Sequence, residues 1–269
     1  CTTEAAGLGR TFPCLAAGVI QMSVARIFLS AVLLCTALDV WAEPAWVGRF
    51  SEADPAIPAP WKIEHLNEKY PPTRYALRRW DGVVAIEARA DKSMALLGRP
   101  VAVDLKKTPI LCWQWRIDAP VASADMNRKS GDDYAARVYL TFSVPPEQLG
   151  LGTRTKLALA RSIYGDQVPD AALNYVWDNI HPVGTLQDNA YTDRTRMLVL
   201  RSGAGKAGAW VQERRNVRKD FQLAFGDIGG QLSGLAIASD TDNTGEKAHA
   251  GFADFRFVEN EAACPAPDS

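Results

Sequence analysis

The stretch Gly131–Phe142 predicts a strand whose two faces differ in chemistry. Successive side chains of a strand point to opposite faces of a sheet, so Arg137 and Tyr139 share one face. The other face is predicted to be apolar and to comprise Tyr134, Ala136, Val138, Leu140 and Phe142. A guanidinium binds carboxylates through paired hydrogen bonds, and a flat aromatic ring offers an apolar surface to a sugar. We therefore interpret the Arg137 face as the floor of a binding groove.

Polar and aromatic side chains of other predicted strands are expected to join this face. Residues 110–118 predict a strong strand in which Gln114 and Arg116 lie opposite a core face of aliphatic and tryptophan side chains. The predicted ligand-binding set is Gln114, Arg116, Asp133, Arg137, Tyr139, Tyr175, Trp177, Arg201 and Glu213. An extended glycan, including one that carries uronates, would suit such a set. The alternative is a structural network in which the arginines pair with Asp133, Glu213 and Asp254.

Oxygen-bearing side chains alternate along residues 240–246, with Gly245 at the sixth position, as in the first half of a calcium loop. The predicted metal ligands are Asp240, Asp242 and Asn243, and Ca²⁺ is the one cofactor that the sequence suggests. Position twelve of such a loop would be Gly251 instead of glutamate, and the segment joins predicted strands instead of helices. The alternative is a turn held by side-chain hydrogen bonds.

The neighbouring carboxylates of Asp132 and Asp133 raise the question of acid–base catalysis. A glycosidase needs two carboxyl groups at a set separation across the bond, but adjacent residues of a strand face opposite ways. Either aspartate would therefore need a partner such as Glu213 or Asp242. The alternative is a turn at the start of the strand, with Asp133 paired to an arginine. The sequence accordingly assigns no catalytic residue.

Other familiar site patterns are misplaced or lacking. Residues 203–208 spell GxGxxG but join two predicted strands instead of opening a helix, so they lack the geometry that cradles a phosphate. The three histidines are far apart and show no zinc-binding spacing. No GxSxG or Cys–His nucleophile pattern is present. The net charge of −1 gives no basic excess for nucleic acid.

Turn residues separate about ten short strands, the spacing typical of a sandwich or barrel. The apolar spacing becomes helical between Arg154 and Tyr164, and Asp220–Phe225 predicts about one helical turn. Helices do not alternate with strands, which argues against a parallel sheet. The predicted fold class is all-β: a jelly-roll-like antiparallel β-sandwich with one or two short helices in loops.

Six motifs occur in order along the chain, and together they indicate a family. They are WQWR at 113–116, GDDYAARVY at 131–139, YVW at 175–177, RSG at 201–203, ERRNV at 213–217 and SDTDNTG at 239–245. Over residues 46–258 the chain resembles the bacterial domain-of-unknown-function family 3047 (DUF3047). The resemblance implies a secreted β-sandwich and brings no established catalytic residues. Residues 251–257 are also similar to the last strand of jelly-roll carbohydrate-binding modules, at the level of fold only.

Residues Met22–Ala42 have the layout of a secretory signal, with Arg26 before an apolar run and a small residue at the expected cleavage point. Together with the upstream extension they form the predicted segment 1–42. A single β-sandwich domain is expected over residues 43–260, followed by a tail at 261–269. The predicted localisation is periplasmic or secreted, and no apolar run beyond the signal approaches membrane length.

Two cysteines, Cys112 and Cys264, remain after the expected cleavage. An oxidising compartment permits a bridge between them, and two free thiols are the alternative.

Three functions are compatible with these patterns. The first is non-catalytic binding of a glycan or another extended polar ligand. The second is a polysaccharide lyase or hydrolase on the same fold, in which Gln114 and Arg137 would neutralise a uronate and Tyr139 would move the proton. The third is a structural envelope protein with no small ligand.

Overall fold

The computed structural model describes residues 43–51, 56–165 and 168–264, apart from the side chains of residues 163 and 164. The chain divides into a unit Cys1–Val40 and a unit Trp41–Ser269, and every described element belongs to the second. The predicted upstream extension and signal peptide, residues 1–42, lie outside the described residues. No helix in the described part is long and apolar enough to cross a membrane.

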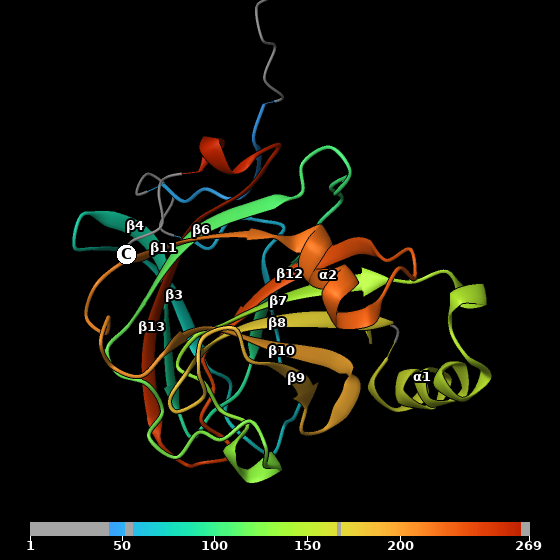
Figure 1. Cartoon of the computed structure of the whole chain (residues 1–269). Helices are drawn as coiled ribbons and strands as arrows, with labels where there is room; N and C mark the ends of the chain where they lie inside the picture. Colours follow the sequence, from blue (N-terminus) through green and yellow to red (C-terminus); the bar gives the residue numbers. More distant parts are fainter. Residues whose placement is uncertain (1–42, 52–55, 166–167, 265–269) are drawn as a thin grey trace, which may run out of the picture. The chain divides into compact units, whose positions relative to one another are not determined.

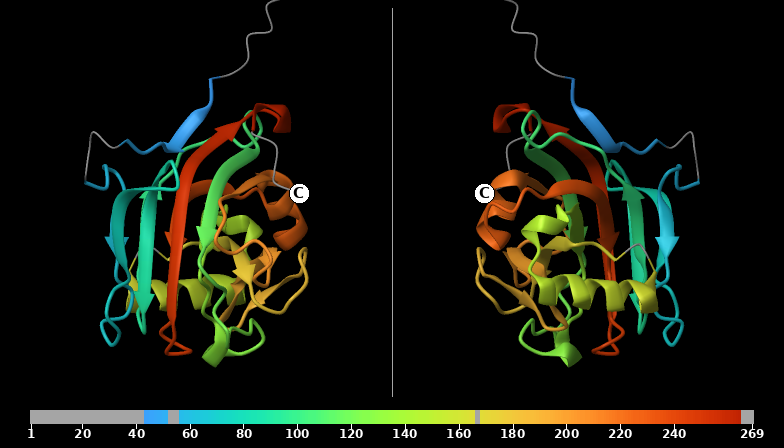
Figure 2. Two further views of the ribbon diagram at one scale, coloured as in Figure 1. Left: turned by 90° about the vertical axis from the view of Figure 1, so that its left-hand side faces the viewer. Right: turned by 90° about the vertical axis from the view of Figure 1, so that its right-hand side faces the viewer.

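Two β-sheets face each other in a sandwich, which confirms the predicted fold class (Figure 1). Sheet A has the order β11 (Val211–Asn216), β6 (Ile110–Ile117), β13 (Lys247–Val258), β4 (Val83–Asp91) and β3 (Arg74–Trp80), and β1 (Ala45–Gly48) also pairs with β13. Sheet B has the order β2 (Lys62–Glu64), β5 (Leu96–Pro100), β12 (Gln231–Ala238), β7 (Arg137–Ser143), β8 (Ala171–Asp178), β10 (Thr192–Ser202) and β9 (Leu186–Asn189). The left view of Figure 2 shows the teal, red and green strands of sheet A side by side.

One strand pair departs from the antiparallel prediction. β8 and β10 run parallel, with Thr195 opposite Ala172 and Leu198 opposite Tyr175. Parallel neighbours need a crossover instead of a tight turn, and here the connection contains β9, which then pairs antiparallel with β10. Every other strand pair among the described residues is antiparallel.

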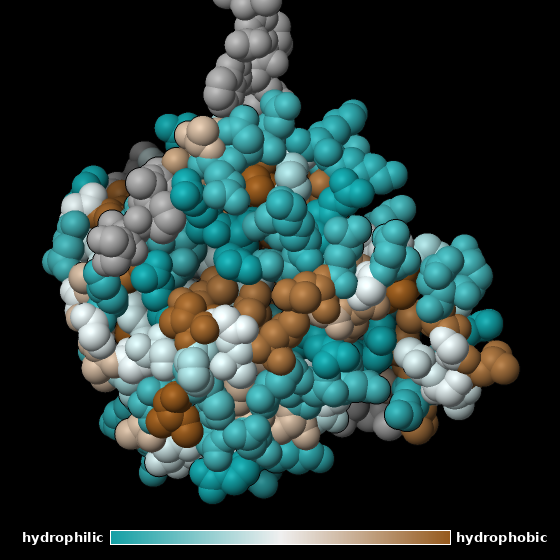
Figure 3. Space-filling view, viewed as in Figure 1, coloured by the Kyte–Doolittle hydropathy of each residue, from teal (hydrophilic) through white to brown (hydrophobic). Residues whose placement is uncertain are grey.

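Aromatic side chains from the two sheets meet in the core. Trp113 of β6 stacks on Tyr175 of β8 with 5.7 Å between ring centroids, and Trp115 lies 5.8 Å from Trp177. All four are at most 1% exposed, and truncating a buried aromatic of this size typically costs about 3–5 kcal/mol. Hydrophilic residues cover most of the face seen in Figure 3, with hydrophobic residues gathered across its middle.

The helices lie in connections, as predicted, but begin earlier. α1 (Leu151–Tyr164) ends at Gly165, whose φ of 90° suits glycine. α2 (Val217–Phe225) begins after Asn216, whose side chain accepts a hydrogen bond from the Lys219 N–H at 3.0 Å. Such a cap satisfies one of the free N–H groups of the first turn. Three short 3₁₀ helices complete the described elements: η1 (Lys129–Gly131), η2 (Pro146–Gln148) and η3 (Glu261–Ala263).

The question of the cysteines is resolved by a disulfide between Cys112 in β6 and Cys264, which follows η3. Both residues are buried, with Ile110 and Val258, in a small apolar cluster. The bond joins positions 152 residues apart and therefore ties the first residues of the predicted tail to sheet A.

Replacing Cys264 by serine should lower the free energy of unfolding by about 2–5 kcal/mol, because the unfolded chain regains the entropy of a long loop. Urea denaturation of wild type and Cys264→Ser, with and without reductant, measures the difference. Reductant should destabilise the wild type and leave the variant unchanged. Equal stability of the two proteins without reductant would show that the bond contributes nothing.

Candidate functional site

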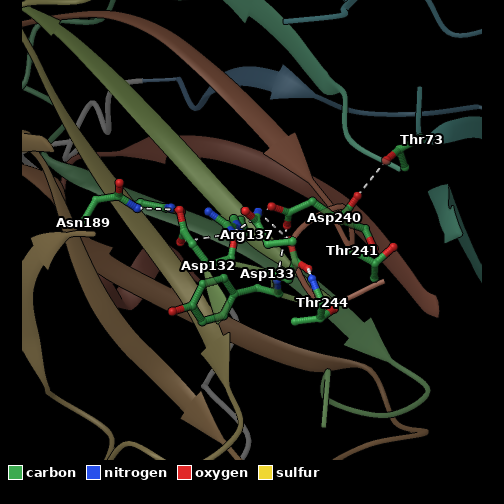
Figure 4. A network of polar contacts seen from close by, with 12 residues as sticks. Thr73, Asp132, Asp133, Arg137, Asn189, Asp240, Thr241 and Thr244 are labelled. Carbon is green, nitrogen blue, oxygen red and sulfur yellow. Dashed lines mark hydrogen bonds and ion pairs between the residues drawn. The ribbon is translucent and has the colours of Figure 1, made fainter. Parts of the chain in front are cut away.

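Arg137, the centre of the sequence prediction, is a buried cation held by several oxygen atoms (Figure 4). Its Nη2 lies 2.7 Å from Oδ2 of Asp240 and 3.3 Å from Oδ1 of Asp132. The same nitrogen donates to the Asp132 carbonyl, and Nη1 donates to the Tyr139 hydroxyl at 2.8 Å. The side chain is 2% exposed. Its two terminal nitrogens therefore bind protein groups and not solvent, while its Nε is buried without a hydrogen-bond partner.

The segment between β6 and β7 covers this part of the outer face of sheet B. Tyr134 places its ring 4.4 Å from the Arg137 guanidinium, and Met126 packs in the same small cluster with Val176 and Met197. Tyr134 thus lies on the opposite side of sheet B from Ala136, Val138, Leu140 and Phe142, which face the core as predicted. The reason is that regular alternation begins only at Arg137, where β7 starts. The predicted groove floor is therefore covered at Arg137, and Tyr139 beside it is half-buried.

Three carboxylates gather beside this arginine. Asp133, Asp240 and Asp242 each offer an oxygen, and these oxygens lie within 4.8 Å of one another. Asp133 accepts hydrogen bonds from Asn243 Nδ2 at 3.1 Å and from the Thr244 N–H at 2.6 Å. Burial raises the pKa of Asp240 well above its ordinary value, although Arg137 opposes the shift. Burial and the charge of Asp133 raise the pKa of Asp242 to about 6.

This cluster offers the ligand chemistry that Ca²⁺ requires, namely several carboxylate oxygens. Oδ1 of Asp242 is buried and has no hydrogen-bond partner. The predicted ligand Asn243 is oriented differently, because its Nδ2 donates to Asp133 and its Oδ1 accepts from the Tyr191 hydroxyl at 2.7 Å. Asp133 takes its place beside Asp240 and Asp242. Calcium binding at these residues stays a prediction.

Arg201, which is half-buried, pairs with the buried Glu213 where β10 of one sheet approaches β11 of the other. Arg201 Nε donates to Glu213 Oε1 at 2.6 Å, and Trp115 Nε1 donates to the same oxygen at 3.0 Å. Burial raises the pKa of Glu213 despite the neighbouring guanidinium. The pair matches the structural network that was the alternative to a binding role.

The remaining predicted residues do not converge with Arg137. Tyr175 and Trp177 face the core, and the Tyr175 hydroxyl donates to Asp220 at 2.7 Å. Gln114 and Arg116 lie on the outer face of sheet A, where Gln114 Nε2 contacts Asp254 at 2.5 Å. The prediction of one shared face is therefore wrong. Alternation shows which side chains of one strand point the same way, but it does not show which sheet contains that strand. The suggested lyase set of Gln114, Arg137 and Tyr139 is divided between two sheets.

The outer face of sheet A carries an arrangement that the sequence analysis missed. The His249 ring stacks on Trp80 with 4.3 Å between centroids, and the Arg116 guanidinium lies 4.0 Å from the same indole. A Cβ at Gly251 would lie 2.6 Å from the Trp210 ring, so only glycine lets that indole approach the sheet. His249 Nε2 lies 2.8 Å from Oε1 of Glu87, and its Nδ1 lies 2.6 Å from Oδ2 of Asp118.

A groove of about 410 Å³, called here the sheet A groove, opens beside this arrangement. It is lined by Arg74, Arg89, Ala90, Asp91, Asp118, Ala119, Lys247, Ala248 and His249. A signal for part of it was present in the sequence, because Asp81-Gly82 is a typical two-residue hairpin turn. That turn pairs Trp80 with Val83 and hence Arg74 with Arg89.

A second cavity, of about 590 Å³, lies between α2, the start of β12 and residues 102–106. Phe221 and Leu232 contribute apolar surface, and the exposed Arg218 lines the cavity. It is larger than the sheet A groove, but its lining includes no residue predicted to bind ligand.

Comparison with known proteins gives a family and a weak structural likeness. A family model described as "Protein of unknown function (DUF3047)" matches residues 59–256, which confirms the resemblance seen in the motifs. No curated protein matches the chain. One similar solved structure is a meso-active thermo-stable cellulase derived from Cel12A of Rhodothermus marinus, with 11% identity, 72% of this chain and 94% of that chain covered, and a TM-score of 0.36. Another is the xyloglucanase domain of NopAA, a type three effector from Sinorhizobium fredii, in complex with cellobiose. Its sequence is 8% identical, the match covers 75% of this chain and 99% of that chain, and the TM-score is 0.33. TM-scores this low support no inference about function.

The raised pKa of Asp242 makes the stability of the protein depend on pH. Between about pH 4 and about pH 6, Asp242 holds its proton in the folded state but loses it in the unfolded state. The free energy of unfolding therefore falls as the pH rises through that range. Asp242→Asn should remove the effect in metal-free buffer. We expect Tm values close to wild type at about pH 4, and a Tm about 2–4 °C above wild type at about pH 7. A constant difference at both pH values would contradict this.

Calcium should stabilise the wild-type protein if the three carboxylates bind it. A Ca²⁺ concentration about 100 times Kd would add about 2.7 kcal/mol to the free energy of unfolding. Thermal denaturation at neutral pH, with Ca²⁺ or with a chelator, measures this shift. Asp242→Asn should lose most of the shift, and magnesium is the matched control ion. An unchanged Tm in millimolar Ca²⁺ would remove the metal assignment.

Proposed function

The chain belongs to the DUF3047 family, and we propose that it is an exported protein that binds a glycan or another extended polar ligand on the outer face of sheet A. The observation that carries the proposal is the sheet A groove, which is open to solvent and lined mainly by charged side chains. Binding sites combine such polar groups with apolar surface. The buried Trp80 stacks on the lining residue His249, and Arg116 lies over both Trp80 and Trp210. By contrast, the predicted site at Arg137 is buried.

Binding without catalysis is favoured by the contacts of His249. Each of its ring nitrogens lies within 2.8 Å of a carboxylate oxygen, one from Glu87 and one from Asp118. A histidine that acts as a general base needs a free nitrogen within reach of the substrate proton. His249 presents none, so it is suited to fixing the geometry of the groove.

Export is supported by two independent features. Residues Met22–Ala42 have the sequence pattern of a secretory signal. The disulfide between Cys112 and Cys264 is a bond that persists in oxidising compartments such as the periplasm or the extracellular space.

Glycan-array screening followed by calorimetric titration tests the proposal on protein recovered from the periplasm or medium of an expression host. The mass of that protein should correspond to a chain beginning at Glu43. Arg89→Ala should weaken binding about tenfold, since a hydrogen bond to a charged group contributes about 1.5–3 kcal/mol. The Arg89 side chain is 53% exposed, so the variant should fold normally.

Two variants serve as controls. Arg218→Ala removes an exposed arginine from the second cavity, and Tyr139→Phe removes the hydroxyl bound to Arg137. Both should bind ligand as the wild type does. Loss of binding in Tyr139→Phe with no change in Arg89→Ala would move the site to sheet B. If no glycan in the panel binds, the proposed binding function is wrong. If the protein stays uncleaved in the cytoplasm, the proposed export is wrong.

A further inference from the structure

The cross-strand register of sheet A places three side chains that can carry positive charge in one row. Arg74 of β3 lies opposite Arg89 of β4, and Arg89 lies opposite His249 of β13. Directly opposed residues of antiparallel strands project from the same face, and like charges in that position are destabilising. All three line the sheet A groove, so the two guanidinium groups and the imidazole face whatever occupies it.

The carboxylates near this row are already engaged. Glu87 Oε1 accepts hydrogen bonds from Arg78 at 2.6 Å and from Arg89 at 2.8 Å, and it also contacts His249. Burial alone would raise the pKa of Glu87, but these hydrogen bonds lower it to about 2. Asp91 pairs with Lys247 at 2.9 Å. Glu87, next to the groove, and Asp91, which lines it, are therefore already paired with cations of the protein.

His249 engages two of the carboxylates near this row. Carboxylate oxygens lie 2.8 Å and 2.6 Å from its two ring nitrogens, on Glu87 and Asp118. These two carboxylates would otherwise be free to offset the arginines.

Arg74 is left without a protein partner. Within the described residues its side chain makes no hydrogen bond and no ion pair, although it is exposed and lies opposite another arginine. The other permanent cations of the groove, Arg89 and Lys247, each have a carboxylate within 2.9 Å. An anion in the groove would supply the missing partner and offset the repulsion between Arg74 and Arg89.

We infer that the sheet A groove binds the carboxylate or sulfate group of an acidic glycan, with Arg74 as the residue that selects the anion. This inference rests on the proposed function and narrows its ligand from polar glycans in general to anionic ones. Arg74 and Arg89 provide two neighbouring guanidinium groups, which suit the paired oxygens of such a group. The affinity should fall as salt is added, because both arginines are exposed.

The experiment compares oligogalacturonate with its fully methyl-esterified form, in which every carboxylate is replaced by a neutral ester. Calorimetric titration of the exported protein should show the acid binding at least about tenfold more tightly than the ester. Arg74→Gln should reduce the affinity for the acid about tenfold and leave that for the ester unchanged. Arg218→Gln, beside the second cavity, should change neither. Inorganic sulfate should raise the Tm of the wild type and have a smaller effect on Arg74→Gln.

A stability measurement separates ligand selection from a structural role. Without ligand, Arg74→Gln should not lower the Tm, because it removes a repulsion and no protein contact. A lower Tm would mean that Arg74 holds the fold, which overturns the inference. Equal binding of acid and ester would also overturn it while leaving the proposed function intact. Failure to bind either probe, sulfate or any neutral glycan would overturn both.

Discussion

The arrangement of polar groups in this protein depends on the packing of aromatic side chains between its two sheets. Trp113 and Trp115 from β6 meet Tyr175 and Trp177 from β8, and all four are buried. Side chains alternate along a strand, so fixing these residues inward fixes their neighbours outward. Gln114 and Arg116 are thereby directed to the outer face of sheet A. Arg137 of the neighbouring β7 projects from the outer face of sheet B.

The outer faces of the two sheets differ in how far their arginines are exposed. On sheet B, the segment before β7 places Tyr134 over Arg137, and the guanidinium is enclosed among carboxylates. Removing charges from water is costly, and their mutual attraction offsets the cost only when the hydrogen bonds are well made. On sheet A, Arg74 and Arg89 stay exposed in an open groove. The buried group of charges is thus suited to holding structure, and the exposed row to meeting a ligand.

Local pattern predicted the elements better than it predicted the site. The inward faces of residues 110–118 and 136–142 follow from alternation alone, because a period of two needs no knowledge of the rest of the chain. The sheet to which a strand belongs is set by contacts distant in sequence, so Gln114 and Arg137 appeared to share a face when they do not. The segment before β7 is mostly polar, and its buried Met126 carried no periodic signal. Alternation assigned Tyr134 to the core face, but the regular strand begins only at Arg137, so Tyr134 packs with Met126 on the other side of the sheet.

The missed groove shows where a sequence signal was sufficient and where it was not. The Asp81-Gly82 turn sets the register that brings Arg74 opposite Arg89, and both turn residues have the positive φ that such a turn requires. Adding His249 to that row requires the pairing of β4 with β13, which are separated by most of the domain. No local sequence pattern predicts that pairing. The sequence alone therefore could not show that Arg74, Arg89 and His249 lie in one row.

If ligand binds over the outer face of sheet A, the indole N–H signals of the nearby tryptophans detect it most directly. Trp80 and Trp210 flank His249 and Arg116 beside the groove, whereas Trp113, Trp115 and Trp177 are in the core. In an NMR titration of protein labelled with ¹⁵N-tryptophan, assigned by single substitutions, the Trp80 and Trp210 signals should move with added acidic glycan while the core signals stay in place. Saturable binding that leaves both of these signals unmoved would contradict the account.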